Sequence, residues 1–183
     1  MSRGGVLVVF FSMAAAISSV PTAHASELIA YFNSPQLPGT STIFPGAYEL
    51  LSASLSLSSN VVIGQGISSV VQPGKVFAKA FQINRASDIS SIAIDTLAFQ
   101  GTTLPSVLIS QTILGVPLFN VTLTDVIISG TAFSASSSGD IITESISLSY
   151  NEYEVTYFTY ANGQPTPQSY DFNLATLKGQ TGA

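Results

Sequence analysis

The sequence predicts a mainly β fold, in which antiparallel strands form one barrel or sandwich with a single short helix beside it. Apolar and polar residues alternate at Leu51–Ser58 and again at Ile142–Ser149, which is the period of a strand with one buried face. Only residues 88–101 have the composition of a helix. Clusters of proline and glycine separate the alternating segments, as the corners of a sheet require.

The N-terminal residues predict an export leader that must be set aside before the fold is considered. Arg3 supplies a positive start, Val6–Ile17 is an apolar run, and Ala23-His24-Ala25 has the form of a signal-peptidase site. The run is shorter than the about 20 apolar residues of a membrane-spanning helix, although an uncleaved N-terminal anchor is the alternative. We therefore expect a signal peptide at 1–25 and a single domain at 26–183.

This leader predicts that the mature protein lies in the periplasm, on the cell surface or in the medium. No later segment is long and apolar enough for a second span, so no membrane span is expected once the leader is removed.

Further segments predict strands because they are rich in β-branched or aromatic residues and end at turn residues. They are Glu27–Asn33, Val76–Asn84, Pro105–Gln111, Leu118–Ser129, Tyr153–Tyr160 and Ser169–Ala175. The predicted turns are Pro35–Gly46, Gly64–Gly74, Ser134–Gly139 and Asn162-Gly163 with the following Pro165 and Pro167.

The predicted helix has candidate residues for both of its ends. Asp88 and Ser91 offer side-chain oxygens that could cap the start, and Gly101 can end the helix. Residues 92–99 are apolar nearly all round, which favours burial on more than one side. A helix of about three turns is marginal alone, so its stability must come from packing on the sheet.

The composition excludes several classes of function. The chain has no cysteine, and its single histidine, His24, lies in the leader. A Ser-His-Asp or Cys-His nucleophile and a zinc site of the usual ligands are therefore excluded from the mature chain. Four Lys and Arg residues against ten Asp and Glu residues give that chain a net charge of −6, so nucleic acid is not an expected partner. We expect no cofactor and no catalytic residue.

The remaining surface is largely Ser, Thr, Asn and Gln, which suits association between copies because few charges repel a neighbour. The predicted strand Glu27–Asn33 offers one variant of assembly, since it could insert into a neighbouring subunit and produce a fibre instead of a ring.

Two functions of other classes compete with assembly. A monomeric binding module for a glycan or a peptide would use Tyr153, Tyr157 and Tyr160 as its aromatic contacts. A hydrolase would need a pair of carboxylates, and Glu152 and Glu154 share one strand face while Glu144 lies on the preceding strand.

Several passages, in the same order and at similar spacing, resemble the haemolysin-coregulated protein (Hcp) family, the tube proteins of type VI secretion systems. Asp88-x-x-Ser91 followed by Gly101 is similar to the family's helix passage, and Leu123–Ser129 resembles one of its strands. Thr143–Tyr150, continuing to Tyr157, resembles the family's "T-E-x-V-x-L-x-F … Y-x-Y" pattern, and Tyr170–Leu174 stands where the family often has Trp-Asp. The resemblance extends from about Tyr48 to Lys178.

The resemblance implies a closed β-barrel with a helix at its side, hexameric rings that stack into a tube, and a conduit or carrier without catalytic activity. It implies that the partners are other copies of the chain and a protein cargo. It assigns structural roles to the motif residues Asp88, Ser91, Gly101, Asp125, Thr143, Glu144, Tyr157 and Asp171. An export leader is not typical of these tube proteins.

Overall fold

The computed structural model describes residues 26–59, 62–63, 71–72, 76–137, 139, 141–174, 176 and 178–182. The predicted signal peptide, residues 1–25, lies outside the described residues. Most of the predicted loop Gly64–Gly74 also lies outside them, and its described part, Val71–Gln72, is a short strand.

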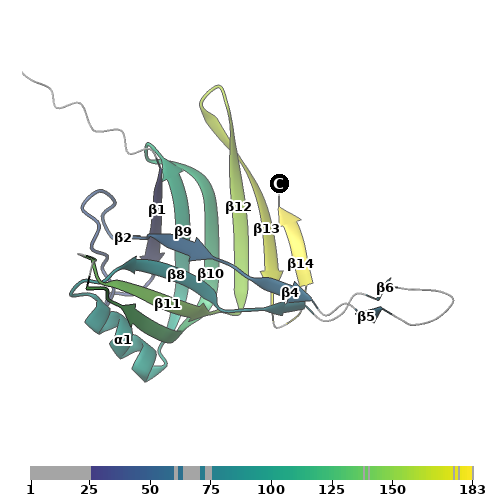
Figure 1. Ribbon diagram of the computed structural model, residues 1–183. Helices are drawn as coiled ribbons and strands as arrows, with labels where there is room; N and C mark the ends of the chain where they lie inside the picture. The colour runs from purple at the N-terminus through teal and green to yellow at the C-terminus, as the bar shows by residue number, and fades with distance from the viewer. Residues whose placement is uncertain are drawn as a thin grey trace, which may run out of the picture.

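The described chain is built almost entirely from strands, which confirms the predicted fold class (Figure 1). The strands are β1 Glu27–Phe32, β2 Tyr48–Glu49, β3 Ser52–Ser54, β4 Leu57–Ser59, β5 Val62–Ile63, β6 Val71–Gln72, β7 Val76–Ala78, β8 Phe81–Ala86, β9 Thr103–Ile113, β10 Val116–Ser134, β11 Thr143–Ser149, β12 Glu152–Ala161, β13 Gln164–Asn173 and β14 Lys178–Gly182. The helix is α1, Ser91–Gln100.

Strand β10 organises the main sheet because its 19 residues serve three neighbours. One edge of β10 pairs with β9 along most of its length. The other edge is shared, since residues 119–124 pair with β12 and residues 127–134 pair with β11. The sheet therefore forks into a branch β12–β13–β14 and a branch β11–β8–β3, and Figure 1 shows β11 and β8 crossing below the upright strands.

The segment from β2 to β3 joins the two sides of the barrel. β2 pairs with β1, whereas β3 pairs with β8. The change of partner falls between Leu50, whose N–H donates to the Leu28 carbonyl, and Leu51, whose N–H donates to the Asn84 carbonyl. The strands thus do not form the closed barrel that was expected, since strand pairing is interrupted between β2 and β3. These two strands are consecutive parts of one segment, and the backbone between them connects the β1 side of the sheet to the β8 side.

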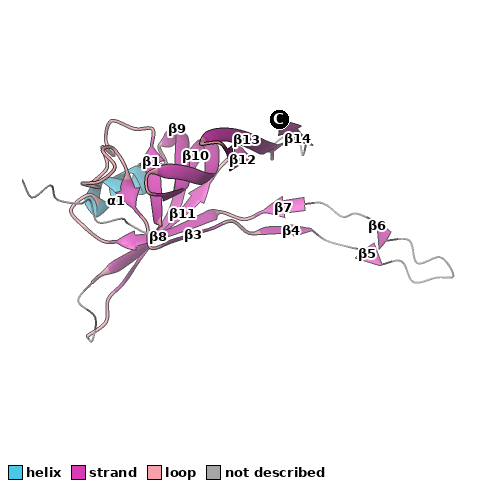
Figure 2. Cartoon of the chain, turned by 90° about the horizontal axis from the view of Figure 1, so that it is seen from above, coloured by secondary structure: helices cyan, strands magenta, loops and turns pink. Residues whose placement is uncertain are grey.

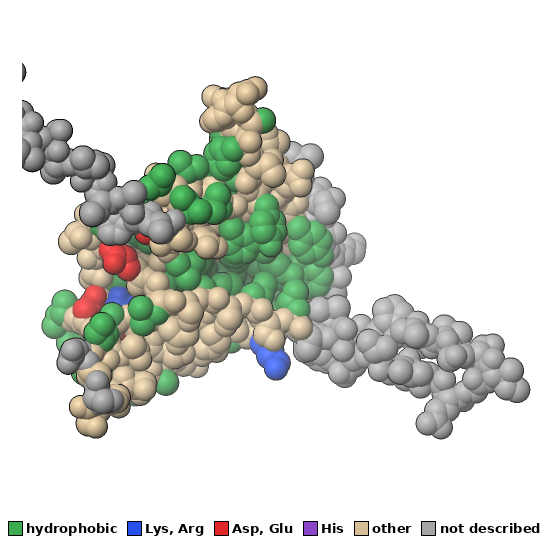
Figure 3. All heavy atoms as spheres, turned by 45° about the horizontal axis from the view of Figure 1, so that its top comes forward, with side chains coloured by type: hydrophobic (Ala, Val, Ile, Leu, Met, Phe, Trp, Pro, Cys, Tyr) green, Lys and Arg blue, Asp and Glu red, His purple; other side chains and the backbone are tan. Residues whose placement is uncertain are grey.

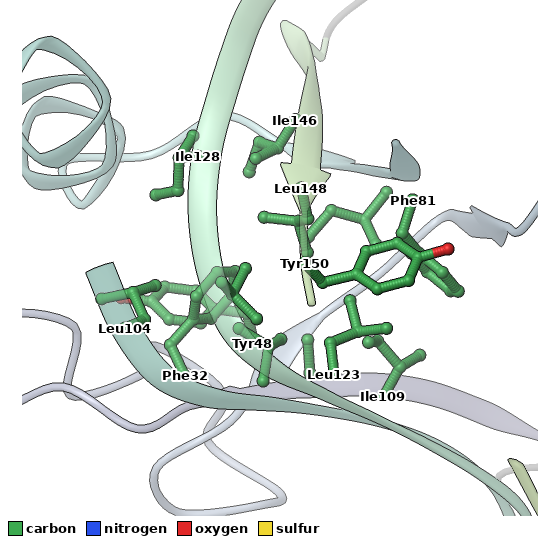
Figure 4. Packing of buried hydrophobic residues seen from close by; sticks show 14 of the residues in the cluster. Phe32, Tyr48, Phe81, Leu104, Ile109, Leu123, Ile128, Ile146, Leu148 and Tyr150 are labelled. Carbon is green, nitrogen blue, oxygen red and sulfur yellow. The ribbon is translucent and has the colours of Figure 1, made fainter. Parts of the chain in front are cut away.

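One hydrophobic core fills the space between the branches, and alternation along each strand supplies it. On β11, Glu144, Ile146 and Leu148 are buried while the serines between them are partly exposed. Figure 4 shows Ile109, Leu123 and Leu148, from three different strands, lying close together in this core. The core therefore holds β1, β2, β8, β9, β11 and β12 around β10.

Helix α1 packs on the sheet through Ile94 and Leu97, which are buried. Gly101 ends the helix in the left-handed conformation, with φ of 60°, which glycine adopts without strain. The N-cap is Ser90, which makes no side-chain cap hydrogen bond. Asp88 is therefore not the N-cap residue, although its carboxylate accepts a hydrogen bond from the Ser90 N–H just before the helix.

A two-stranded hairpin arm, made of β4, β5, β6 and β7, projects from the barrel (Figure 2). Among the described residues, β4 pairs with β7 alone and β5 with β6 alone. The arm prolongs the β3–β8 hairpin, and the Lys79 N–H donates to the Ser56 carbonyl where the two meet. The predicted strands Leu51–Ser58 and Val76–Asn84 are each divided at this junction, with one part in the barrel and one in the arm.

Pro165 and Pro167 lie inside β13, where we had predicted a turn. The turn is confined to Asn162 and Gly163, both with positive φ. β14 pairs only with residues 169–173 of β13, so residues 164–168 have β12 on one side and no strand on the other among the described residues. Proline fits such an outer edge because no ladder partner needs its missing N–H.

Candidate functional site

Arg85 is the centre of a buried cluster of charged side chains beneath α1. It continues the alternation of Phe81 and Ile83 on β8, so its side chain enters the core. Arg85 and Glu144 are each 1 % exposed, and they are direct cross-strand partners between β8 and β11. Nε of Arg85 lies 2.8 Å from Oε1 of Glu144, and the guanidinium carbon lies 4.8 Å from the centre of the Tyr48 ring.

The Arg85–Glu144 contact is an ion pair without the alignment of a hydrogen bond. Among the described residues, no group donates a hydrogen bond to either oxygen of Glu144, and the Tyr48 hydroxyl also lacks a partner. Buried charges are tolerated only when they are paired, so each member of this pair depends on the other. The arrangement holds β8 and β11 in register but offers no nucleophile beside a base.

Asp88 extends the cluster to the surface and to a distant loop. Its carboxylate accepts hydrogen bonds from Arg85 Nη2 (2.6 Å), the Ser90 N–H (2.8 Å) and the Thr40 hydroxyl (2.9 Å). Burial alone would raise the pKa of Asp88, but the hydrogen bonds from Ser90, Arg85 and Thr40 outweigh it and hold that pKa at about 2. The Asp88 carboxylate thereby ties the 33–47 loop to the start of α1.

Sequence reasoning missed Arg85, Tyr48 and Thr40. One signal was available, because Arg85 is the single arginine within residues 26–183 and occupies an apolar position of an alternating strand. Nothing in the sequence places Thr40 near Asp88, since that contact depends on how the loop folds back.

The other motif residues lie far apart in the fold. Ser91, at the first position of α1, is buried and lies 3.1 Å from Ser87 through their hydroxyls. Asp125, with φ of 52°, stands on β10 where the partner changes from β12 to β11. Thr143 begins β11, and Asp171 is exposed on β13. Ser91 therefore borders the Arg85 cluster, because its hydroxyl accepts a hydrogen bond from the Asp88 N–H at 3.3 Å, whereas Asp125 on β10 and Asp171 on β13 do not belong to it.

Of the three carboxylates considered for hydrolysis, two share one hollow and the third lies elsewhere. Glu152 and Glu154 line a polar hollow of about 320 Å³ on the outer face of β10, β12 and β13, together with Asp171. Glu144 is buried against Arg85 on another strand. Glu152 accepts a hydrogen bond from the Asn173 amide, and Glu154 lies directly opposite Asp171.

The tyrosines considered for ligand binding do not share a surface. Tyr153 is buried, with its ring 5.9 Å from Tyr150 and 5.8 Å from Phe172. Tyr157 is exposed on the same strand face, whereas Tyr160 lies on the opposite face and donates to the Pro117 carbonyl at 2.6 Å. The three rings cannot form one aromatic platform.

The proposed donor strand has partners within its own chain. β1 pairs with β9 over Glu27–Phe32 on one edge and with β2 on the other. It is therefore an integral strand of the barrel, which removes the structural basis for strand donation.

Two apolar surfaces are not covered by any of the residues that the structure describes. The first is a groove of about 300 Å³ at the open end of the barrel, visible as the hydrophobic hollow in the middle of Figure 3. It is lined by Leu28, Ala53, Leu55, Phe81, Ile109, Gln111, Phe119, Val121 and Val155. The second is a stripe along α1, formed by Ile89, Ile92 and Phe99, which are 81 %, 66 % and 96 % exposed.

Within the described part of the chain, no group of three His, Cys, Asp or Glu residues could hold a metal ion. The same part of the chain contains no helix of the length and hydropathy needed to cross a membrane.

The comparisons with known proteins agree with this architecture. A family model described as "Type VI secretion system effector, Hcp" matches residues 39–157. A solved type six secretion system protein is 18% identical with a TM-score of 0.74, covering 85% of this chain and 100% of its own. Hcp1 from Salmonella typhimurium is 18% identical with a TM-score of 0.65, covering 85% and 99%. A type VI secretion system effector from Yersinia pestis is 15% identical with a TM-score of 0.58, covering 80% and 98%. No curated protein matches the chain.

Proposed function

The chain belongs to the Hcp family of type VI secretion proteins, and from this premise we propose that it is an exported structural subunit whose copies assemble into rings and tubes. The observation that carries the proposal is the family match over residues 39–157, which extends from the loop after β1 to the middle of β12. The fold supports it, because the strands and the side helix are arranged as in solved members of the family.

Two features of the barrel support contacts between copies. The described strands of the arm pair only with one another, and a two-stranded hairpin is at best marginally stable alone in water. β14 ends its branch of the sheet, with β13 as its one neighbour among the described residues. Both offer backbone groups to a second subunit.

The proposal includes the absence of catalytic activity. The mature chain has neither histidine nor cysteine, and the buried carboxylate Glu144 is neutralised by Arg85. Among the lining residues whose side chains the structure describes, none beside the exposed carboxylates of the polar hollow is cationic. The chemistry of the chain thus supports a conduit or carrier, with a protein as the proposed cargo.

We further propose that residues 1–25 are removed after export. The assembled protein would then lie in the periplasm, on the cell surface or in the medium. N-terminal sequencing of the exported protein should begin at Ser26, and a retained Arg3 would contradict the cleavage.

The experiment that tests the function is light scattering with negative-stain electron microscopy on the protein purified after export. We expect rings, with six subunits as the family resemblance implies, that stack at higher concentration. A monomer at every concentration would overturn the assembly function and leave only the fold.

A further inference from the structure

We propose that the apolar stripe of α1 in one copy docks into the apolar groove of the next copy, so that subunits associate end to end. The inference rests on the proposed assembly function and names the two surfaces that make the contact. Both surfaces are described above, and neither is covered by the described residues of the chain that carries it.

The stripe has the geometry of a docking helix. Ile92 and Phe99 are seven residues apart, which places them on one face of α1, and Ile89 prolongs that face at the start. Thr96 lies between them and donates its hydroxyl to the Ile92 carbonyl at 2.7 Å, so that hydroxyl needs no outside acceptor. An exposed helix face with apolar residues at this spacing is the pattern that inserts into hydrophobic grooves.

The groove has the matching chemistry. None of its lining residues is charged, and its single polar side chain, Gln111, already donates to the Ser26 hydroxyl at 3.3 Å. A volume of about 300 Å³ is at the lower limit of pockets that hold ligands and is large enough for a phenylalanine side chain. A charged occupant would lose its hydration there without gaining a partner.

The positions of the two surfaces make the contact intermolecular. Phe119 and Val121 of β10 line the groove, whereas the end of α1 lies beside residues 128–131 of the same strand. The two surfaces are about ten residues apart along β10, on either side of the irregular position Asp125. A surface at one end that fits a different surface at the other end produces a head-to-tail contact, which repeats into a ring or a filament.

Cysteine cross-linking tests the contact directly, because the chain has no cysteine of its own. Phe99→Cys and Ala53→Cys would be made separately, purified after export, mixed and oxidised. We expect a disulfide between the two different variants, identified by mass spectrometry of the linked peptides. Ile141→Cys mixed with Ala53→Cys is the matched control, since Ile141 is 62 % exposed but belongs to neither surface.

Substitution of Phe99, the largest side chain of the stripe, gives a second test. Phe99→Ser should raise the concentration at which assemblies form by at least about tenfold, because the burial of one aromatic side chain is lost. Its circular dichroism should match that of the wild type, since Phe99 is exposed in the single subunit. Ile141→Ser should assemble as the wild type does.

The outcomes separate this inference from the function on which it rests. If the wild type never assembles, the proposed function is overturned, and the inference with it. If the wild type assembles and Phe99→Ser assembles at the same concentration, only the inference is overturned. Recovery of an acyl chain or an unrelated protein from the groove of assembled wild type would also overturn it.

Discussion

The two ends of β10 differ in where they place charge. Beside α1, Arg85 and Glu144 are each 1 % exposed while Phe99 is 96 % exposed. At the β12–β13 end the arrangement is the usual one, with Glu152, Glu154 and Asp171 on the outer face. The α1 end is thus inverted, with charge inside and an apolar stripe outside, and such a surface is typical of a site that another protein covers.

The largest expected effect comes from breaking the buried charge cluster of the inverted end. Arg85→Ala leaves Glu144 buried without a counter-charge, and we expect a loss of about 3–5 kcal/mol in the free energy of unfolding. Urea unfolding followed by circular dichroism measures it. Lys79→Ala, at an exposed position, is the control and should change stability by less than about 0.5 kcal/mol.

Should Arg85→Ala fail to fold, Arg85→Lys keeps the charge but loses the forked contacts to Asp88 and Glu144, so a smaller loss is expected. A loss below about 1 kcal/mol for Arg85→Ala would contradict the role assigned to the cluster.

The second expected effect is a loss of stability at alkaline pH, and it arises from Tyr150 in the core next to β12. Burial, followed by the neighbouring Tyr153, raises the pKa of Tyr150 to about 12 from 10.0. Because the folded protein favours the protonated phenol, this stabilisation is complete below pH 10 and is lost as the pH rises through 12. We expect the wild type to lose about 2 kcal/mol over that interval.

Tyr150→Phe is the comparison for this alkaline effect, because it removes the ionising hydroxyl and keeps the ring contact with Tyr153. Its stability should change less than that of the wild type between pH 10 and 12, as measured by urea unfolding at each pH. Parallel curves for the two proteins would show that Tyr150 does not carry the effect.

The third expected effect is a loss of stability in acid, and it arises from Asp88 beside α1. The pKa of Asp88 is lowered from 3.8 to about 2, so its stabilisation is present above pH 4 and is lost as the pH falls through 2. Since 37% of its side chain is exposed, solvent screening reduces the expected contribution to about 1 kcal/mol. The stability difference between wild type and Asp88→Asn should shrink over this interval; a constant difference from pH 5 to 2 would contradict it.

The smallest expected effect is at the β12–β13 end of β10, and it is a gain in stability where the other effects are losses. Glu154 and Asp171 are direct cross-strand neighbours of like charge, so Glu154→Gln should raise the free energy of unfolding by about 0.2–1 kcal/mol. Glu152→Gln is the matched control, because it weakens the hydrogen bond from Asn173 and should not stabilise. The gain should diminish in high salt, and a loss for Glu154→Gln would show that the two carboxylates do not repel.

The sequence predicted the strands best where alternation was strict. Ile142–Ser149 corresponds to β11, Thr143–Ser149, because one face of that strand is wholly buried. The same alternation at Leu51–Ser58 could not show that the chain leaves the barrel after Ser54, since the arm continues the same period. Pro165 and Pro167 suggested a turn because nothing in the sequence reveals that β13 is an outer strand there.

The candidate site was less predictable than the fold. The alternation of β8 predicts that Arg85 lies in the core. A single arginine in an apolar pattern does not indicate that Glu144, Thr40 or Tyr48 are its neighbours. Those contacts join parts of the chain that are far apart in sequence. Asp88 was assigned to the helix cap because it precedes α1, whereas the arginine and the distant loop compete successfully for its carboxylate.

The prolines on the outer edge of β13 also restrict the direction of growth. A weakly charged protein made of strands is at risk of unlimited lateral polymerisation, in which each new chain extends the last sheet. Residues 165 and 167 have no N–H to offer an incoming strand, so that stretch of β13 cannot template further sheet. Strand pairing with a second copy on this branch is thereby confined to β14, its last described strand, and the prolines keep residues 164–168 from amyloid-like extension of the sheet.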